Sequence, residues 1–360
     1  MSGDSREQDG VLLKDYRPIS KLKVEHHPVT VPKFPVIDAH GHFADLYLPL
    51  YAGSQPWIPT DVDALVTRLR RQGIRRIVNL DGFWDGFHGH ELERIFATTR
   101  DHADFFIHFA SVNTTEIERP DFAARVERHL ERTQSLGARG IKLFKHVSLM
   151  VEEASGVYRP GRGVRIDDPR LAVIWKTAAR LRLPVLVHIA DPEAFFDPVD
   201  ATNERYLELL QHPDWSYHGA GTYSFAELMQ AQQNVLRDNP DTTFIIAHVG
   251  SNAEHLGFVA SCLERFPNMV VDIAARIDEL GRQYHTTRRF FERFADRILF
   301  GTDVYSWTVD WCYTPYFTFL ETDDDAIPGS HWPMTGLKLS DDILEKIYWK
   351  NATRVLGLDG

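Results

Sequence analysis

The chain has 360 residues, 43% of them hydrophobic and 25% charged, so a large core can form and overall disorder is excluded. Asp and Glu outnumber Lys and Arg by 51 to 40, and the net charge of -11 argues against a nucleic-acid partner, because neutralising phosphates needs clustered cations. The 2 cysteines exclude a disulfide scaffold. No apolar run approaches the roughly 18 residues of a membrane span and no apolar signal segment is visible, so we expect a cytoplasmic protein without a membrane partner.

Residues 1–34 differ from the rest of the chain. They are polar, contain several prolines and show no helical or strand period. We predict that they form an arm lying on the body of the protein or on a neighbouring subunit. Residues 35–360 are predicted to form a single domain.

Short apolar runs rich in β-branched residues recur along this domain. Runs of this kind are typical of parallel strands buried on both faces. We predict eight strands, at Val36–His42, Ile74–Leu80, Phe105–Val112, Gly140–Phe144, Pro184–Ile189, Thr243–Val249, Met269–Ile273 and Ile298–Phe300.

Helices are predicted between the strands. Apolar residues recur at i, i+3, i+4 and i+7 from Val62, from Leu171 and from Leu256, and a last helix is expected from about Ser340. Eight strands alternating with helices favour an α/β fold of the (β/α)8 TIM-barrel type. The alternative is an open doubly wound sheet, but no G-x-G-x-x-G follows a strand.

Long insertions follow several of the predicted strands. They span Tyr47–Pro59, His146–Asp167, Asp191–Tyr223 and Val304–Leu339. Loops that follow the strands of a barrel gather on its catalytic face. We therefore expect a catalytic face with long loops.

Candidate catalytic residues stand at the ends of these strands. His40 and His42 are two apart, so in a strand both imidazoles face the same way. His188, His248 and Asp303 each end or follow an apolar run. Polar residues at the carboxyl ends of barrel strands can converge on one point, and imidazole is a common metal ligand. A metal site is therefore the favoured interpretation, and four separately satisfied buried histidines are the alternative.

The motifs D-A-H-G-H at 38–42, V-H-I at 187–189, A-H-V-G at 247–250 and G-T-D at 301–303 resemble those of the amidohydrolase superfamily. The similarity runs from Val36 to Leu358 and is greatest to the group of aminocarboxymuconate semialdehyde decarboxylase and related hydrolases. The resemblance implies that His40, His42, His188 and Asp303 bind one divalent ion. Zn2+ suits three nitrogens and one oxygen, whereas Mn2+, Co2+ and Fe2+ stay open.

The resemblance also implies roles for the remaining polar residues. The ion would lower the pKa of a bound water toward about 7. His248 would hold this water and shuttle a proton, Asp303 would share the catalytic work, and Asp38 would be structural. Relatives often pair as dimers, so a homodimer or higher homo-oligomer is expected, with the arm as a candidate contact.

Two cationic residues are candidates for binding the substrate. Lys142 lies in an apolar strand, where a lysine is costly unless it is paired. The resemblance offers two roles for it, a carboxylated bridge between two metals or a substrate contact, and we favour the second with a single metal. Arg276 follows the seventh strand, where it could grip a carboxylate or form a salt bridge at the rim. Lys145 is expected to be solvated.

Three functions remain open. The favoured one is a metal-dependent hydrolase in which the bound water attacks an amide, ester or lactone of a small organic substrate. The alternative is a non-oxidative carboxy-lyase acting on an unsaturated or aromatic carboxylic acid, and the third is a non-catalytic binding barrel. No G-x-S-x-G elbow or P-loop supports another chemistry. A second His-x-His, His88 and His90, is assigned to the pocket edge or to solvent.

Overall fold

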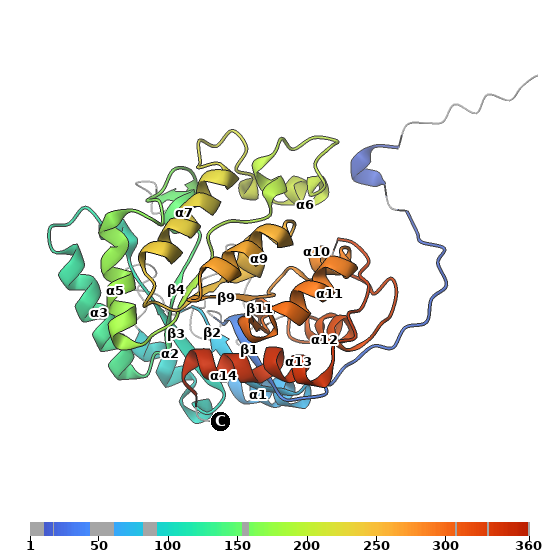
Figure 1. The fold of residues 1–360 in the computed structure, drawn as a ribbon, viewed down its shortest axis with the longest axis horizontal. Coiled ribbons are helices and arrows are strands. Elements are labelled where there is room, and N and C mark those ends of the chain that lie inside the picture. The colour runs from blue at the N-terminus through green and yellow to red at the C-terminus, as the bar shows by residue number, and fades with distance from the viewer. Residues whose placement is uncertain are drawn as a thin grey trace, which may run out of the picture.

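The fold was analysed in a computed structural model, which describes residues 11–16, 18–43, 61–81, 92–152, 158–306, 308–329 and 331–358. A parallel sheet forms its centre, and helices surround it (Figure 1). In the described residues no helix is both long enough and apolar enough to cross a membrane. The predicted TIM barrel is confirmed.

The central sheet has nine strands in the order β10-β9-β8-β7-β4-β3-β2-β1-β11, all paired in parallel. Seven of them match predicted strands one to seven, and the eighth is divided into two short pieces. Their bounds are β1 Val36–His42, β2 Ile74–Asn79, β3 Phe106–Ser111, β4 Gly140–Leu143, β7 Val185–Val187, β8 Phe244–Ile246, β9 Met269–Asp272, β10 Ile298–Leu299 and β11 Val304–Tyr305.

The division of the eighth strand closes the barrel. β10 pairs with β9, whereas β11 pairs with β1, and the main-chain nitrogen of Asp303 donates to the carbonyl of His40 over 2.9 Å. The prediction that an insertion begins at Val304 is therefore wrong by two residues. Val304 and Tyr305 belong to the barrel because they supply the hydrogen bonds that the free edge of β1 needs.

The helices follow the strands and cover the outside of the sheet (Figure 1). Longer helices present one apolar face to the sheet, as Leu65, Val66 and Leu69 do in α1. Their bounds are α1 Val62–Arg71, α2 Leu92–Thr98, α3 Phe122–Leu136, α5 Ala172–Leu181, α7 Phe225–Asp238, α9 Leu256–Arg265, α11 Tyr284–Arg293, α13 Asp341–Glu345 and α14 Asn351–Leu356. A π-helical turn, Lys346–Lys350, joins α13 to α14.

The loops after the strands carry further short elements. They are α4 His146–Leu149, the antiparallel pair β5 Met150–Glu152 and β6 Tyr158–Pro160, α6 Tyr206–Gln211, α8 Ala247–Gly250, α10 Ile277–Gly281 and α12 Tyr313–Glu321. The predicted insertion Tyr47–Pro59 lies outside the described residues. The described residues of the other three insertions follow the carboxyl ends of the strands, and two of these insertions, Asp191–Tyr223 and Val304–Leu339, contribute residues to the walls of the site.

Candidate metal centre and its cavity

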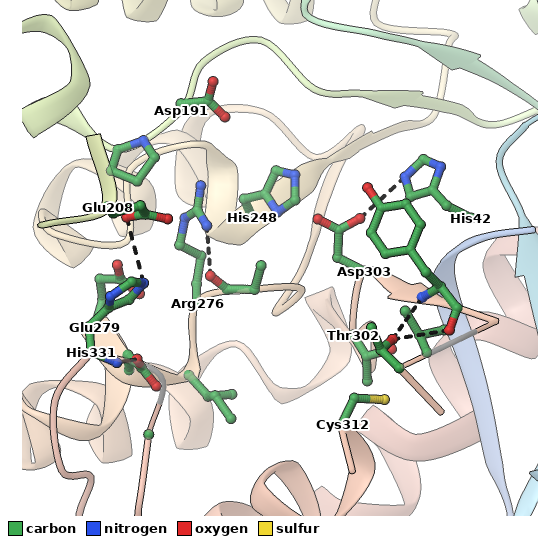
Figure 2. A pocket seen from close by; sticks show the side chains of 18 of the residues that line it. His42, Asp191, Glu208, His248, Arg276, Glu279, Thr302, Asp303, Cys312 and His331 are labelled. Atoms are coloured by element: carbon green, nitrogen blue, oxygen red, sulfur yellow. Dashed lines mark hydrogen bonds and ion pairs between the residues drawn. The ribbon is translucent and has the colours of Figure 1, made fainter. Parts of the chain in front are cut away.

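The two histidines of β1 point to one side of the strand, as their spacing predicts. His40 is fully buried, and His42 lies at the rim of the cavity. Their ring centroids are 5.5 Å apart. Figure 2 shows His42 facing Asp303.

His248 and Asp303 come to the same place through unusual backbone conformations. Each follows the end of a strand with a positive φ, 57° for His248 and 65° for Asp303. A residue with a side chain rarely adopts this left-handed conformation, and both side chains line the cavity at the end of the barrel. His188, which follows β7, places its ring centroid 4.3 Å from that of His248.

Three of these residues form a group of ligand atoms close enough to hold one ion. One atom each from His40, His248 and Asp303 lies within 4.8 Å of the other two. The Nε2 atom of His42 is 3.2 Å from Oδ1 of Asp303, so His42 borders the group. The Nε2 atoms of His40 and His248 are buried without a hydrogen-bond partner. Buried lone pairs around a carboxylate fit a divalent cation.

The second nitrogen of three of these histidines faces a carboxylate. His40 Nδ1 lies 2.8 Å from Asp272, His42 Nδ1 lies 2.6 Å from Asp81, and His188 Nε2 lies 3.2 Å from Asp191. Such contacts fix the tautomer and leave the other nitrogen free to bind a metal.

The electrostatics keep His188, His248 and Asp303 in the protonation states that a metal requires. Burial lowers the pKa of His188 to about 4 and that of His248 well below its usual value, so both rings are neutral. Burial alone would raise the pKa of Asp303, but the nearby rings of His40 and His42 outweigh it and hold the pKa well below the usual range. Neutral imidazoles and an ionised carboxylate are the forms that bind metal. Burial alone would lower the pKa of His42, but the carboxylates of Asp81 and Asp303 outweigh it and raise the pKa to about 9, so this ring must release a proton before it can bind an ion.

Beneath this group lie two buried residues with different surroundings. Asp38 accepts hydrogen bonds from the hydroxyls of Thr302 and Tyr313 and from the main chain of His40. Lys142 is fully buried, and its Nζ has no hydrogen-bond partner. Burial lowers the pKa of Lys142 to about 8, against the pull of nearby carboxylates that include Asp303. Lys142 is absent from the residues that line the cavity above.

A cavity of about 790 Å³ opens over the histidines. Arg276 stands in its wall beside His248 (Figure 2). The side chain is 8% exposed, and Nη1 donates to the carbonyl of Ala275. Among the residues that the structure describes, no carboxylate forms an ion pair with it. A rim salt bridge, the alternative prediction for Arg276, is thus not present among the described residues, although the carboxylates of Glu279 and Glu254 lie near enough to outweigh burial and raise its pKa.

The wall on the other side of Arg276 is a charged network that the sequence did not indicate. Arg205, which precedes α6, is ion-paired with Glu208 and with Glu279 of α10. His331 lies 3.6 Å from Glu208. These residues come from three loops far apart in the sequence, so no local pattern could have found them.

Lys145 is paired rather than solvated, which corrects the expectation from the sequence. Its Nζ lies 2.6 Å from Oδ2 of Asp191, and the hydroxyl of Tyr217 donates to the same oxygen over 2.6 Å. Asp191 thereby joins Lys145 and Tyr217 to His188. Of these contacts, only the one between His188 and Asp191 joins residues close together in the sequence, three positions apart. It is the one contact that the sequence could have indicated. His88 and His90 lie outside the described residues.

Comparisons with known proteins agree with this architecture. The structure is similar to 2,6-dihydroxybenzoate decarboxylase from Rhizobium, with a TM-score of 0.55, 16% identity and coverage of 91% of this chain and 100% of that one. A dihydroxybenzoic acid decarboxylase from Polaromonas sp. JS666, with bound manganese and 2-nitroresorcinol, gives a TM-score of 0.54, 15% identity and 90% and 97% coverage.

A putative 2-pyrone-4,6-dicarboxylic acid hydrolase from Pseudomonas putida gives a TM-score of 0.50, 14% identity and coverage of 90% of this chain and 98% of that one. No curated protein matches the sequence. The sequence model of the amidohydrolase family matches residues 37–358, which include every residue of the candidate centre. With the barrel and the histidine cluster in place, this match means that the chain belongs to the amidohydrolase family.

Proposed function

We propose that this protein is a metal-dependent carboxy-lyase that removes carbon dioxide from a small unsaturated or aromatic carboxylic acid. The observation that carries the proposal is Arg276, a buried guanidinium in the cavity wall without a carboxylate partner among the described residues. The carboxylates of Glu279, Glu254, Asp191 and Asp303 outweigh burial and raise the pKa of Arg276, but none of them forms an ion pair with it. A substrate carboxylate in the cavity could therefore bind the guanidinium directly, through two parallel hydrogen bonds.

The metal is proposed to be held by His40, His42, His188 and Asp303. Three nitrogens and one oxygen favour zinc, and manganese, cobalt and iron accept the same ligands. A divalent ion at this position supplies a Lewis acid that stabilises negative charge developing on the substrate. Lys142 is not among the residues that line the cavity, so we assign binding of the substrate carboxylate to Arg276 and not to Lys142.

Decarboxylation then needs one proton from the protein. The bond between the carboxylate and its carbon breaks, the electron pair stays on that carbon, and a proton replaces the carbon dioxide. The neutral ring of His248 would take up this proton at Nε2 from solvent and pass it to the carbon. His248 lines the cavity and is buried, so a proton on its ring is directed at the substrate and not at bulk water.

Hydrolysis of an amide, ester or lactone is the second candidate. It is favoured by the position of Asp303, whose side chain is 25% exposed to the cavity and could take a proton from an attacking water. In that reaction Arg276 would bind a carboxylate remote from the reacting bond.

One assay separates the two reactions. The metal-loaded protein is incubated in H218O with aromatic and unsaturated carboxylic acids and with esters, lactones and amides that carry a carboxylate. We expect one carbon dioxide per product and no 18O in that product. Incorporation of 18O into the product without release of carbon dioxide would identify the reaction as hydrolysis and not decarboxylation.

The grip of Arg276 is tested with Arg276→Lys, which keeps the charge but loses the paired geometry. We expect KM to rise about 10–100-fold, since a lost charge-assisted contact is worth roughly 1.5–3 kcal/mol, with unchanged metal content. Arg282→Lys is the matched control, because Arg282 lies outside the cavity lining and pairs with Glu204. An unchanged KM in Arg276→Lys would contradict the proposed role.

A further inference from the structure

We propose that Asp272 is a positioning residue that sets the metal-binding tautomer of His40 and holds the main chain of His248. One carboxylate at the end of β9 would thereby control two imidazoles from β1 and from the turn after β8. The inference concerns the metal centre and does not depend on whether the reaction is decarboxylation or hydrolysis.

The two oxygens of Asp272 have separate partners. Oδ2 lies 2.8 Å from Nδ1 of His40. Oδ1 accepts from the main-chain nitrogen of His248 at 2.8 Å and from that of Ala274 at 3.1 Å. Both Asp272 and His40 are fully buried, so water does not compete for these contacts.

Gly301 provides the space for the pair. A Cβ atom at this position would lie 3.1 Å from Cβ of His40 and 3.2 Å from Cβ of Asp272. Such distances are shorter than ordinary van der Waals contact, so a larger residue would push the two side chains apart. The glycine therefore belongs to the same arrangement as the carboxylate.

The contact at Oδ2 decides which nitrogen of His40 can bind a metal. A carboxylate only accepts hydrogen bonds, so the neutral imidazole must carry its proton on Nδ1. The lone pair is then on Nε2, which is buried without a hydrogen-bond partner and lies 3.4 Å from Asp303. The tautomer that Asp272 selects is the one that directs a lone pair at the candidate metal position.

The contact at Oδ1 acts on the backbone. His248 has a φ of 57°, a conformation that a residue with a side chain rarely adopts. The hydrogen bond from its main-chain nitrogen to Asp272 ties this left-handed turn to β9. The ring of His248 is thus held over the same point as that of His40, with 5.0 Å between the ring centroids.

Substitution by asparagine separates the two contacts. In Asp272→Asn the amide oxygen can replace Oδ1 and keep both main-chain hydrogen bonds. The amide NH2 then faces Nδ1 of His40 and donates to it, which moves the ring proton to Nε2 and removes the lone pair from the metal position. In the opposite orientation the amide NH2 would face the main-chain N–H groups of His248 and Ala274. All of these groups are donors, so this orientation is unfavourable.

The test uses the full chain labelled with 15N-histidine and stripped of metal. Long-range 15N–1H correlation spectra report the tautomer of each ring, and the His40→Gln variant identifies the signals of His40. We expect the Nδ1–H tautomer in the wild type and the Nε2–H tautomer in Asp272→Asn. We also expect the affinity for Zn2+, measured by competition with a chromogenic chelator, to fall about 10–100-fold.

Asp324→Asn is the matched control. Asp324 is a buried carboxylate that contacts Nδ1 and the main-chain nitrogen of His27, away from the metal centre. The variant Asp324→Asn should leave the affinity for Zn2+ and the NMR signals of His40 unchanged. Gly301→Ala disturbs the His40–Asp272 contact without removing the carboxylate, so a similar loss of affinity is expected there even if Asp272→Asn does not fold.

Retention of the Nδ1–H tautomer, or of the Zn2+ affinity within twofold, in folded Asp272→Asn would overturn the proposal. An unchanged affinity in Gly301→Ala would do the same. Failure to find any decarboxylase or hydrolase activity would affect the proposed function but not this result, because both readouts use metal and protein alone.

Discussion

The five polar residues at the strand ends do not occupy equivalent positions. His40 and His248 place unpartnered nitrogens beside Asp303. His188 directs Nε2 at Asp191, which leaves Nδ1 as its remaining nitrogen. His188 is proposed as a ligand and His248 as the residue that moves a proton, although His248, and not His188, belongs to the group of ligand atoms that the structure brings together.

Alanine variants of these two histidines distinguish their roles. The wild type should contain about one equivalent of a transition metal by elemental analysis, because the described residues bring one group of ligand atoms together, from His40, His248 and Asp303. His188→Ala should lose most of this metal. His248→Ala should keep it and lose roughly 10²–10⁴ in turnover, the usual effect of removing a positioned acid–base group.

Equal metal loss in both variants would identify His248 as a ligand. A metal content near two equivalents in the wild type would instead favour the two-metal arrangement. Lys142 would then be examined for carboxylation by mass spectrometry, because its unpartnered Nζ lies among carboxylates beneath the site.

At the scale of single elements, buried polar side chains link strands and helices around the barrel. His108 of β3 contacts Nδ2 of Asn79 at the end of β2 and the hydroxyl of Thr99 after α2. Its Nδ1 accepts from the amide of Asn79, so the ring must be neutral for this link to form. Burial lowers the pKa of His108 to about 3.

This link predicts a loss of stability in acid. An unfolded histidine has a pKa of about 6.5, so below this value the unfolded chain binds a proton that the folded chain excludes. The contribution of His108 is fully present above pH 6.5 and decreases as the pH falls toward 3, by about 1.4 kcal/mol per pH unit.

The free energy of unfolding in urea, measured between pH 7 and pH 5, checks this expectation. His108→Gln should reduce the slope with pH, because glutamine does not titrate. His285→Gln, at an exposed position, should leave the slope unchanged. An identical slope in all three proteins would show that His108 does not control the acid sensitivity.

At the scale of the whole molecule, the described part of the N-terminal arm contacts the barrel from His27 onward. It contacts α12, the loop after α12 and α13, through Val29 to Thr318, His27 to Asp324, and Lys33 to Glu321 and Asp341. Residues 18–26, and residues 11–16 before them, extend away from the body (Figure 1). They expose apolar side chains there, among them Leu12 at 59%, Ile19 at 81% and Leu22 at 70%.

We propose that this segment packs against a second copy of the chain. Apolar side chains exposed together on one segment commonly mark a protein contact. Deletion of residues 1–26 should lower the mass measured by light scattering from that of a homodimer or larger assembly to that of a monomer. The triple variant Leu12→Ser, Ile19→Ser, Leu22→Ser should act in the same direction, and a wild type that is already monomeric would refute the proposal.

The sequence by itself determined the features that depend on local geometry. The spacing of His40 and His42 places both on one side of a strand because strand side chains alternate, and the apolar runs marked the strands because a parallel sheet is buried on both faces. The same argument placed His188, His248 and Asp303 at strand ends. The strand predicted at Thr243–Val249 included His248, however, whereas β8 stops at Ile246.

Only the tertiary structure decided the contacts between residues distant in the chain. His40 and Asp272 are separated by 232 positions, and Arg205 and Glu279 by 74. No period in the sequence carries such pairings, because they arise when the closed barrel brings loops from different strands together. For the same reason the sequence does not indicate the pairing of Lys145 with Asp191, or that Arg276 lies in the cavity wall without an ion pair among the described residues.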